Sequence, residues 1–354
     1  MRFIGNKENL VDRIYQTIIT KDIKGESFFD FFSGTTSVGR YFKTRDYKVI
    51  SSDLLYFSYV LQRAYITNNE DPKFDKLLKT IDAKDDSLFS NSLLKVINHL
   101  NNLTPVKGFI YNNYSDEGTK DLSKPRMYFT SDNSKFIDAV RQKIEEWKES
   151  DLISEDEYFI LLACLIETAP FYANIAGVYA AFQKKWDPRA LKRISLRPIS
   201  IIKNSKQNVS YNTNSVELID NITADIIYLD PPYNQRQYAP NYHLLETIAK
   251  YDNPKISGVA GLRNYDKQKS KFCNAKTALE ELKYIANTAC YKYLILSYNS
   301  EGIMKTKDII STLEQFGKVE TIEFDYLRFK SNSNGNSKNK KFVQEQLYIL
   351  KNEK

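Results

Sequence analysis

Two short apolar segments that flank a helical pattern place the strongest constraint on the fold of this chain. The apolar segments cover residues 27–32 and 47–53, and between them Val38, Tyr41 and Phe42 recur at helical spacing. A strand, a helix and a strand within about thirty residues form one βαβ unit, and such a unit requires parallel strands. The sequence therefore predicts an α/β fold with a parallel sheet.

The same kind of element appears before this unit and again much later in the chain. A helix is expected over residues 7–19, and apolar strands are expected over residues 224–230 and 293–298. Residues 319–329 and 342–350 are predicted to form an antiparallel pair. The α/β pattern is thus interrupted and then resumed.

The region between the two parts shows no alternation of strands and helices. Helices are expected there over residues 74–103, 137–147 and 158–171. Residues 108–115 are aromatic and are expected to be irregular. We therefore predict a discontinuous domain made of residues 1–70 and 208–354, into which residues 71–207 are inserted as a largely helical domain.

Composition excludes several classes of protein. No apolar run approaches the length of a membrane span, and the first residues lack the apolar core of a secretory signal. The three cysteines are too dispersed for a disulfide framework or a zinc ribbon, which suits a reducing cytoplasm. With only two histidines, we expect no metal centre, and we expect a cytoplasmic protein without a membrane partner.

The turn after the first predicted strand has features of a ligand-binding loop. The segment from Asp30 to Gly39 reads DFFSGTTSVG, with Thr36 where a dinucleotide fingerprint has another glycine. Gly34 would let a ligand approach the backbone closely, and the following helix would offer free amide donors. A generic tight turn between a strand and a helix is the alternative.

Asp53 follows the second predicted strand, nineteen residues after Gly34. An acid at this point of a βαβ unit can accept hydrogen bonds from ribose hydroxyls. The alternative is that Asp53 caps the helix expected over residues 54–65.

A third signal is the tetrapeptide Asp230-Pro231-Pro232-Tyr233, which directly follows an apolar strand. Consecutive prolines fix the backbone and make the strand end a rigid platform. The platform offers a carboxylate, a proline carbonyl and an aromatic ring, which suit a flipped-out base with an exocyclic amino group. A rigid turn that ends a strand is the alternative.

Together these segments resemble the D12 class, or α group, of DNA adenine-N6 methyltransferases. The resemblance rests on the opening segment RFIGNK at residues 2–7, the segment from Asp30 to Gly34, and the late tetrapeptide from Asp230 to Tyr233. It covers about the first seventy residues and the part after residue 209. It implies a Rossmann-like S-adenosylmethionine-dependent methyltransferase fold with an inserted, mainly helical target-recognition domain.

The resemblance also implies the roles of individual residues. The opening motif would contact the methionine end of the cofactor, and Asp53 would hold its ribose. The segment Asn212-Thr213-Asn214-Ser215 stands where the family often has an acid that contacts the cofactor's adenine, and either Asn212 or Asn214 would take that place. The residues implied to bind S-adenosylmethionine are Phe3, Gly5, Asn6, Lys7, Asp30, Phe31, Phe32, Ser33, Gly34, Thr35, Asp53, Leu54, Asn214 and Asp230. The implied catalytic residues are Asp230, Pro231, Pro232 and Tyr233.

The implied reaction is site-specific methylation of adenine N6 in double-stranded DNA, as the modification enzyme of a restriction–modification system. A cognate restriction endonuclease that acts independently would be its partner, and the enzyme would be a monomer or weak dimer. Two alternatives stay open. One is a methyltransferase for another exocyclic amine, such as an RNA adenine or guanine or a DNA cytosine N4; the other is a catalytically silent DNA-binding module.

The basic residues of the chain are concentrated in one segment. Residues 183–207 contain eight basic residues and one acid, so this segment carries a net charge of +7, equal to that of the whole chain. Such a local excess is expected at a phosphate backbone; a solvated helix face is the alternative. The residues predicted to bind DNA are Lys184, Lys185, Arg189, Lys192, Arg193, Arg197, Gln235, Arg236 and Tyr238. The last three follow the tetrapeptide and could equally form a plain surface loop.

Two further segments are candidates for DNA contact. Residues 328–341 hold five basic residues and no acid. Asn and Arg side chains suit the edges of adenine and guanine. Candidates for reading bases within the insertion are therefore Tyr111, Asn112, Asn113, Tyr114, Arg126 and Tyr128.

Overall fold

The computed structural model describes residues 6–81, 91–327 and 342–352, and these form two compact units. Within the described residues, the sheet unit comprises residues 6–67, 202–239 and 266–352, apart from the gap at 328–341. The helical unit comprises residues 68–201, apart from the gap at 82–90, together with residues 240–265.

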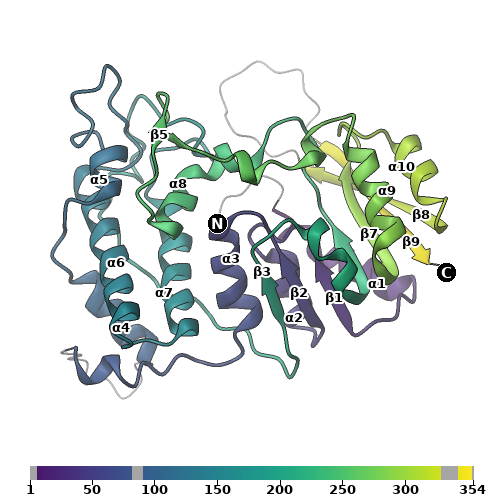
Figure 1. Cartoon of the computed structure of the whole chain (residues 1–354), viewed down its shortest axis with the longest axis horizontal. Coiled ribbons are helices and arrows are strands. Elements are labelled where there is room, and N and C mark those ends of the chain that lie inside the picture. Colours follow the sequence, from purple (N-terminus) through teal and green to yellow (C-terminus); the bar gives the residue numbers. More distant parts are fainter. Residues whose placement is uncertain (1–5, 82–90, 328–341, 353–354) are drawn as a thin grey trace. The chain divides into compact units, whose positions relative to one another are not determined.

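The sheet unit is built on seven strands in the order β3-β2-β1-β4-β7-β9-β8 within the described residues (Figure 1). The pairs β1–β2, β1–β4, β2–β3 and β4–β7 are parallel, whereas β9 runs antiparallel to β7 and β8. The strands are β1 (Ser27–Asp30), β2 (Lys48–Ser52), β3 (Val209–Tyr211), β4 (Thr223–Leu229), β7 (Cys290–Asn299), β8 (Gly317–Leu327) and β9 (Phe342–Asn352). The predicted parallel sheet and the predicted antiparallel pair are both confirmed.

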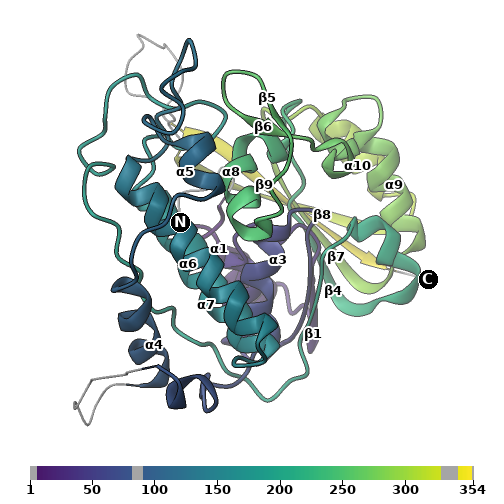
Figure 2. The same ribbon diagram turned by 60° about the vertical axis from the view of Figure 1, so that its left-hand side comes forward.

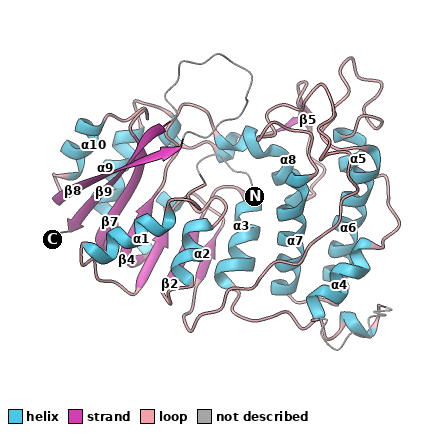
Figure 3. Cartoon of the chain, turned by 180° about the vertical axis from the view of Figure 1, so that it is seen from behind, coloured by secondary structure: helices cyan, strands magenta, loops and turns pink. Residues whose placement is uncertain are grey.

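Helices cover both faces of this sheet because the strands are apolar on both sides (Figure 3). Phe28 of β1 packs with Ile14 and Phe42 on one face, and the next residue, Phe29, packs in the core of the other face with Leu282 and Ile309. The helices are α1 (Val11–Thr20), α2 (Ser37–Lys43), α3 (Tyr56–Gln62), α9 (Ala278–Thr288) and α10 (Thr306–Leu313). A π-helical turn at Arg63–Thr67 continues α3.

The helical unit confirms that the middle of the chain is dominated by helices (Figure 2). Its helices are α4 (Ser92–Asn101), α5 (Phe109–Tyr114), α6 (Ser131–Glu149), α7 (Glu155–Thr168) and most of α8 (Tyr238–Lys250), and a small hairpin joins β5 (Ile256–Ser257) to β6 (Leu262–Arg263). Residues 240–265 belong to this unit, although the sequence grouped them with residues 208–354. No helix among the described residues is long and apolar enough to cross a membrane.

The irregular segment predicted at residues 108–115 is instead helical, because a distant side chain caps it. Asp138 of α6 accepts hydrogen bonds from the backbone amides of Gly108, Ile110 and Tyr111 at 3.0, 2.9 and 2.8 Å. These amides lie at the start of α5, where a helix has no partners of its own. A side chain some thirty residues away therefore decides the local structure.

Replacing Asp138 with alanine is expected to destabilise the helical unit by about 2–4 kcal/mol, because three amides and the Tyr251 hydroxyl lose their acceptor. Hydrogen exchange of the α5 amides should become faster, which mass spectrometry can follow peptide by peptide. Asp132→Ala is the matched control, since its side chain on the same helix is 93% exposed. Equal exchange in both variants would contradict the capping role.

Candidate active site

The turn after β1 adopts a conformation that suits close approach of a ligand. Gly34 has a φ of 49° and Thr36 a φ of 63°, so both lie in the left-handed region. Thr36 is fully buried and its hydroxyl donates to the Thr35 carbonyl at 2.6 Å. A threonine thus occupies a backbone conformation that glycine adopts more readily.

Asp30, at the end of β1, fastens this turn to the following helix. Its carboxylate accepts the Gly39 amide of α2 at 3.1 Å, and a Cβ on Gly39 would meet the same oxygen at 3.2 Å. Burial raises the pKa of Asp30 to about 7, against the opposing effect of the Gly39 hydrogen bond. Asp30 is therefore a buried hydrogen-bond acceptor that ties the end of β1 to α2 across the turn.

Asp53, after β2, joins two parts of the site through its two carboxylate oxygens. One oxygen accepts the Gly34 amide at 2.8 Å, and the other accepts the Leu55 amide at 2.8 Å, just before α3. The helix-capping role that the sequence left open is not seen, because the cap position of α3 is Leu55 and it has no side-chain cap. Asp53 instead closes a turn to Leu55 and holds the glycine turn.

The tetrapeptide follows β4, which is a direct parallel neighbour of β1. Asp30 is paired in register with Tyr228, and the Phe31 amide donates to the Tyr228 carbonyl at 3.1 Å. The carboxyl ends of parallel strands lie at one edge of a sheet, so the glycine turn and Asp230 emerge side by side. Pro231 is buried, and the partly buried Tyr233 accepts the Ile303 amide at 3.1 Å.

Lys7 lies at the centre of a buried group of charges. Its ammonium is 3.2 Å from Asp230 Oδ1 and also contacts Glu345 Oε1, and the three side chains are only 6%, 16% and 3% exposed. Burial alone would lower the pKa of Lys7, but the two carboxylates outweigh it and raise that pKa. Burial raises the pKa of Asp230 to about 7; Lys7 opposes the rise and Glu345 adds to it.

Glu345 was not predicted as a site residue, although one signal in the sequence marks it. In β9 the residues Glu345, Leu347 and Ile349 alternate on one face, and Leu347 and Ile349 belong to the core beneath α1. A glutamate in register with core leucine and isoleucine residues is costly to bury without a partner. That partner is Lys7.

The other predicted cofactor residues are placed as follows. Phe31 is fully buried in the core, whereas Phe32 is half-buried and packs edge-on against Phe272 at 5.4 Å. Asn6 accepts the Ser37 hydroxyl at 2.7 Å, and Asn214 accepts the Val216 amide at 3.2 Å. The buried residues Ser33 and Thr35 and the half-buried Leu54 also lie at the ends of β1 and β2. Phe3 and Gly5 lie outside the described residues.

The prediction that three tyrosines read bases is wrong. Tyr111, Tyr114 and Tyr128 are at most 5% exposed and lie in the core of the helical unit. Arg126 is also engaged within that unit: it donates to the carbonyls of Gly258 and Val259, each at 3.1 Å. It thereby braces the β5–β6 hairpin. Their aromatic and basic character gave no means of separating core packing from base contact.

The basic segment contains exposed side chains on irregular backbone, not on a helix face. The exposed basic residues of the segment are Lys184, Lys185, Lys192, Arg193, Arg197 and Lys203. Arg189 differs, because it forms an ion pair with Asp187 at 2.5 Å. Gln235 and Arg236, after the tetrapeptide, are exposed, and Tyr238 begins α8. The other basic stretch, residues 328–341, lies outside the described residues.

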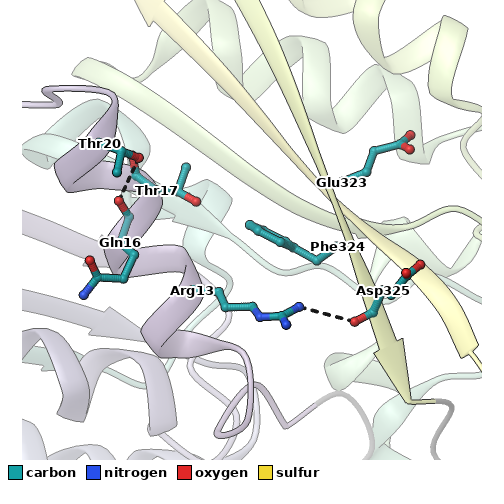
Figure 4. Close-up of a pocket in the computed structure, with 7 residues that line it drawn as sticks. All are labelled: Arg13, Gln16, Thr17, Thr20, Glu323, Phe324 and Asp325. Atoms are coloured by element: carbon teal, nitrogen blue, oxygen red, sulfur yellow. Dashed lines mark hydrogen bonds between the residues drawn. The ribbon is translucent and has the colours of Figure 1, made fainter.

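A hollow on the surface of the sheet unit lies apart from these motifs, between α1 and β8 (Figure 4). Arg13 donates to the Asp325 carbonyl at 3.4 Å and lies 5.8 Å from the ring of Phe324. None of its lining residues belongs to the opening motif, the glycine turn or the tetrapeptide. Among the described residues, no cluster of His, Cys, Asp or Glu is arranged to hold a metal ion.

Comparison with known proteins decides the family. The protein family described as "D12 class N6 adenine-specific DNA methyltransferase" matches residues 3–312 of this chain. The chain belongs to this family. It is 42% identical over 336 residues to the type II methyltransferase M.FokI of Planomicrobium okeanokoites, covering 94% of this chain and 50% of the relative. It is 38% identical over 357 residues to M.NlaIII of Neisseria lactamica, covering 99% of both chains.

A third D12 relative is the modification methylase StsI of Streptococcus sanguinis, 36% identical over 357 residues, covering 99% of this chain and 52% of the relative. The chain thus spans about half the length of M.FokI and of StsI, but almost the whole of M.NlaIII. The resemblance inferred from the three motifs is confirmed, and it extends through the helical middle of the chain.

Proposed function

We propose that this chain is a site-specific DNA methyltransferase that transfers a methyl group from S-adenosylmethionine to N6 of adenine in duplex DNA. The observation that carries the proposal is the placement of Asp230 and its prolines at the end of β4, beside the glycine turn at the end of β1. A modification role in a restriction–modification system fits the names of its relatives, type II methyltransferases and modification methylases.

The residues at the strand ends fit the cofactor. We expect the Asp53 carboxylate to accept ribose hydroxyls, the half-buried Phe32 ring to contact the methionyl part, and Asn214 to contact the adenine. Bound S-adenosylmethionine would supply an electrophilic sulfonium methyl group, and the protein would supply orientation. Lys7 is turned toward Asp230, so any contact that it makes with the methionine end is additional to this ion pair.

The tetrapeptide would activate a weak nucleophile by positioning it. The Asp230 carboxylate and a carbonyl near Pro231 would accept the two N–H bonds of the target amine, which leaves the nitrogen lone pair free to attack the methyl group in line. Once methylated, the nitrogen is cationic and loses its proton readily, so a strong base is unnecessary. The Tyr233 ring would stack on the flipped-out base, a contact worth about 1–3 kcal/mol.

Helical-unit residues would recognise the DNA target, and the exposed basic segment would contact phosphates. We further propose that the enzyme acts in the bacterial cytoplasm as a monomer or weak dimer, and that a cognate restriction endonuclease acts independently of it. Methylation of another exocyclic amine is the second candidate function. Sequencing of DNA from an expressing host tests both: N6-methyladenine within one recurrent motif supports the proposal, and unmodified adenine refutes it.

Charge reversal at Lys192 and Arg193 is expected to weaken binding to all DNA sequences and to reduce the magnitude of its salt slope by about 2, since each lost phosphate contact removes about 0.9. Fluorescence anisotropy with duplex DNA at several salt concentrations measures both effects. The control reverses two exposed lysines of α9 and α10, Lys283 and Lys307, which are predicted to make no DNA contact. Equal slopes in both double variants would reassign the basic segment to solvent.

A further inference from the structure

Asp230, Lys7 and Glu345 form a connected network of charges that extends from the end of β4 past β7 to β9. Asp230 ends β4, Glu345 lies on β9, and the ammonium of Lys7 touches both. On β7, between these strands, the Ser297 hydroxyl donates to Glu345 Oε1 at 2.7 Å. Ser297 pairs in register with Leu347, so it faces the same side of the sheet as Glu345.

We propose that Glu345 is a positioning residue for methyl transfer: it holds the Lys7 ammonium against Asp230, so that the Asp230 carboxylate meets the target amine in one orientation. This inference rests on the proposed function, because it concerns the acceptor of the target amine. The Glu345 carboxylate contacts Lys7 and Ser297, and it would position Asp230 through Lys7.

The geometry supports this role over a purely structural ion pair. A lysine between two carboxylates that is only 6% exposed has little freedom to turn elsewhere, so its position is set by both acids. Ser297 fixes the oxygen of Glu345 that Lys7 contacts. Removing Glu345 would therefore change the position and electrostatics of Lys7, although Asp230 itself would remain in place.

Lys7 and Glu345 carry opposite charges, so they should shift the pKa of Asp230 in opposite directions, and these shifts can be measured. Lys7 favours the ionised form of Asp230, and Glu345 opposes it through its negative charge. The other titratable groups that act on this carboxyl are Asp30 at the end of β1 and the Tyr228 phenol of β4. Removing Glu345 and removing Lys7 should therefore shift the titration of Asp230 in opposite directions.

Two isosteric or near-isosteric variants test this. In Glu345→Gln the pKa of Asp230 is expected to fall by about 1 unit, and in Lys7→Gln to rise by about 1 unit, since a nearby charge shifts a carboxyl pKa by roughly that amount or more. The probe is the carboxyl carbon of Asp230 in protein labelled with ¹³C at aspartate carboxyls. Its signal is assigned by its absence in Asp230→Asn, and no cofactor or DNA is needed.

The functional half of the test is the pH profile of methylation. With unmodified phage DNA and tritiated cofactor, the acid limb of kcat/KM should move down in Glu345→Gln and up in Lys7→Gln, and Glu345→Gln should also lower kcat at high pH because Lys7 is less well held. Glu320→Gln, which removes the same charge from the neighbouring strand β8, is the control and should leave both profiles unchanged.

The outcomes separate the two proposals. An unshifted Asp230 signal in both variants overturns the coupling, whatever the activity. Shifted signals with unshifted acid limbs overturn the positioning role while the methyltransferase assignment stands. No methylation by the unaltered protein, with the carboxyl signals shifted as expected, overturns the proposed function and leaves the coupling intact. If Glu345→Gln fails to fold, Ser297→Ala replaces it, because it releases the Glu345 oxygen that Lys7 contacts: a lower kcat at high pH supports the positioning role, and an unchanged kcat overturns it.

Discussion

Asp230→Ala is expected to abolish methyl transfer, by at least about 10³-fold in kcat, while cofactor binding stays measurable. The carboxylate is the acceptor that would orient the target amine, and it emerges beside the glycine turn. The variant removes that acceptor but leaves the Lys7–Glu345 ion pair in place. Incorporation of tritiated methyl groups into DNA measures the first effect, and calorimetry with S-adenosylmethionine measures the second.

The matched control for this experiment is Asp308→Ala, which removes an aspartate from α10 that lies outside the site motifs. It should retain full activity. Near-normal methylation by Asp230→Ala would remove Asp230 from the catalytic role. Loss of both activity and cofactor binding would instead show that the tetrapeptide shapes the cofactor site.

A second large effect is expected at Asp53. Asp53→Ala should weaken binding of S-adenosylmethionine by about 10²-fold, because charge-assisted hydrogen bonds are each worth about 1.5–3 kcal/mol. The substitution also releases the Gly34 amide, which Asp53 now holds at 2.8 Å, so the turn loses a constraint. Activity at saturating cofactor should recover substantially, because Asp53 is expected to bind the cofactor and not the reacting amine.

Calorimetric affinity and the KM for the cofactor both report on this change. Asp220→Ala, at an exposed position before β4, is the control and should bind the cofactor normally. If Asp53→Ala bound the cofactor as tightly as the unaltered protein, the Asp53 carboxylate would serve only to hold the amides of Gly34 and Leu55.

Local patterns in the sequence predicted the sheet well, because a strand buried on both faces has an unmistakable run of apolar residues. The segments that became β1, β2, β4 and β7 were all expected, and so was the antiparallel pair of β8 and β9. Three chain segments far apart in sequence were placed at one site because a motif marked each of them. Their proximity then followed from the order of strands in a parallel sheet.

The unexpected features depend on contacts between distant residues. Helix α5 forms where Asp138, on another helix, caps its first amides. Tyr114 and Tyr128 looked like surface aromatics but fill the core of the helical unit. Glu345 is recognised as part of the site only through its contact with Lys7, more than three hundred residues earlier in the chain. Propensity and periodicity are local, so none of these pairings could be read from them.

The position of β9 inside the sheet, between β7 and β8, has a consequence for how the molecule is made. A ribosome must translate past Asn352 before β9 can insert between β7 and β8, and until then these two strands have no bridge between them. Glu345 enters the sheet with β9, so its ion pair with Lys7, from the start of the chain, forms only after β9 has been synthesised.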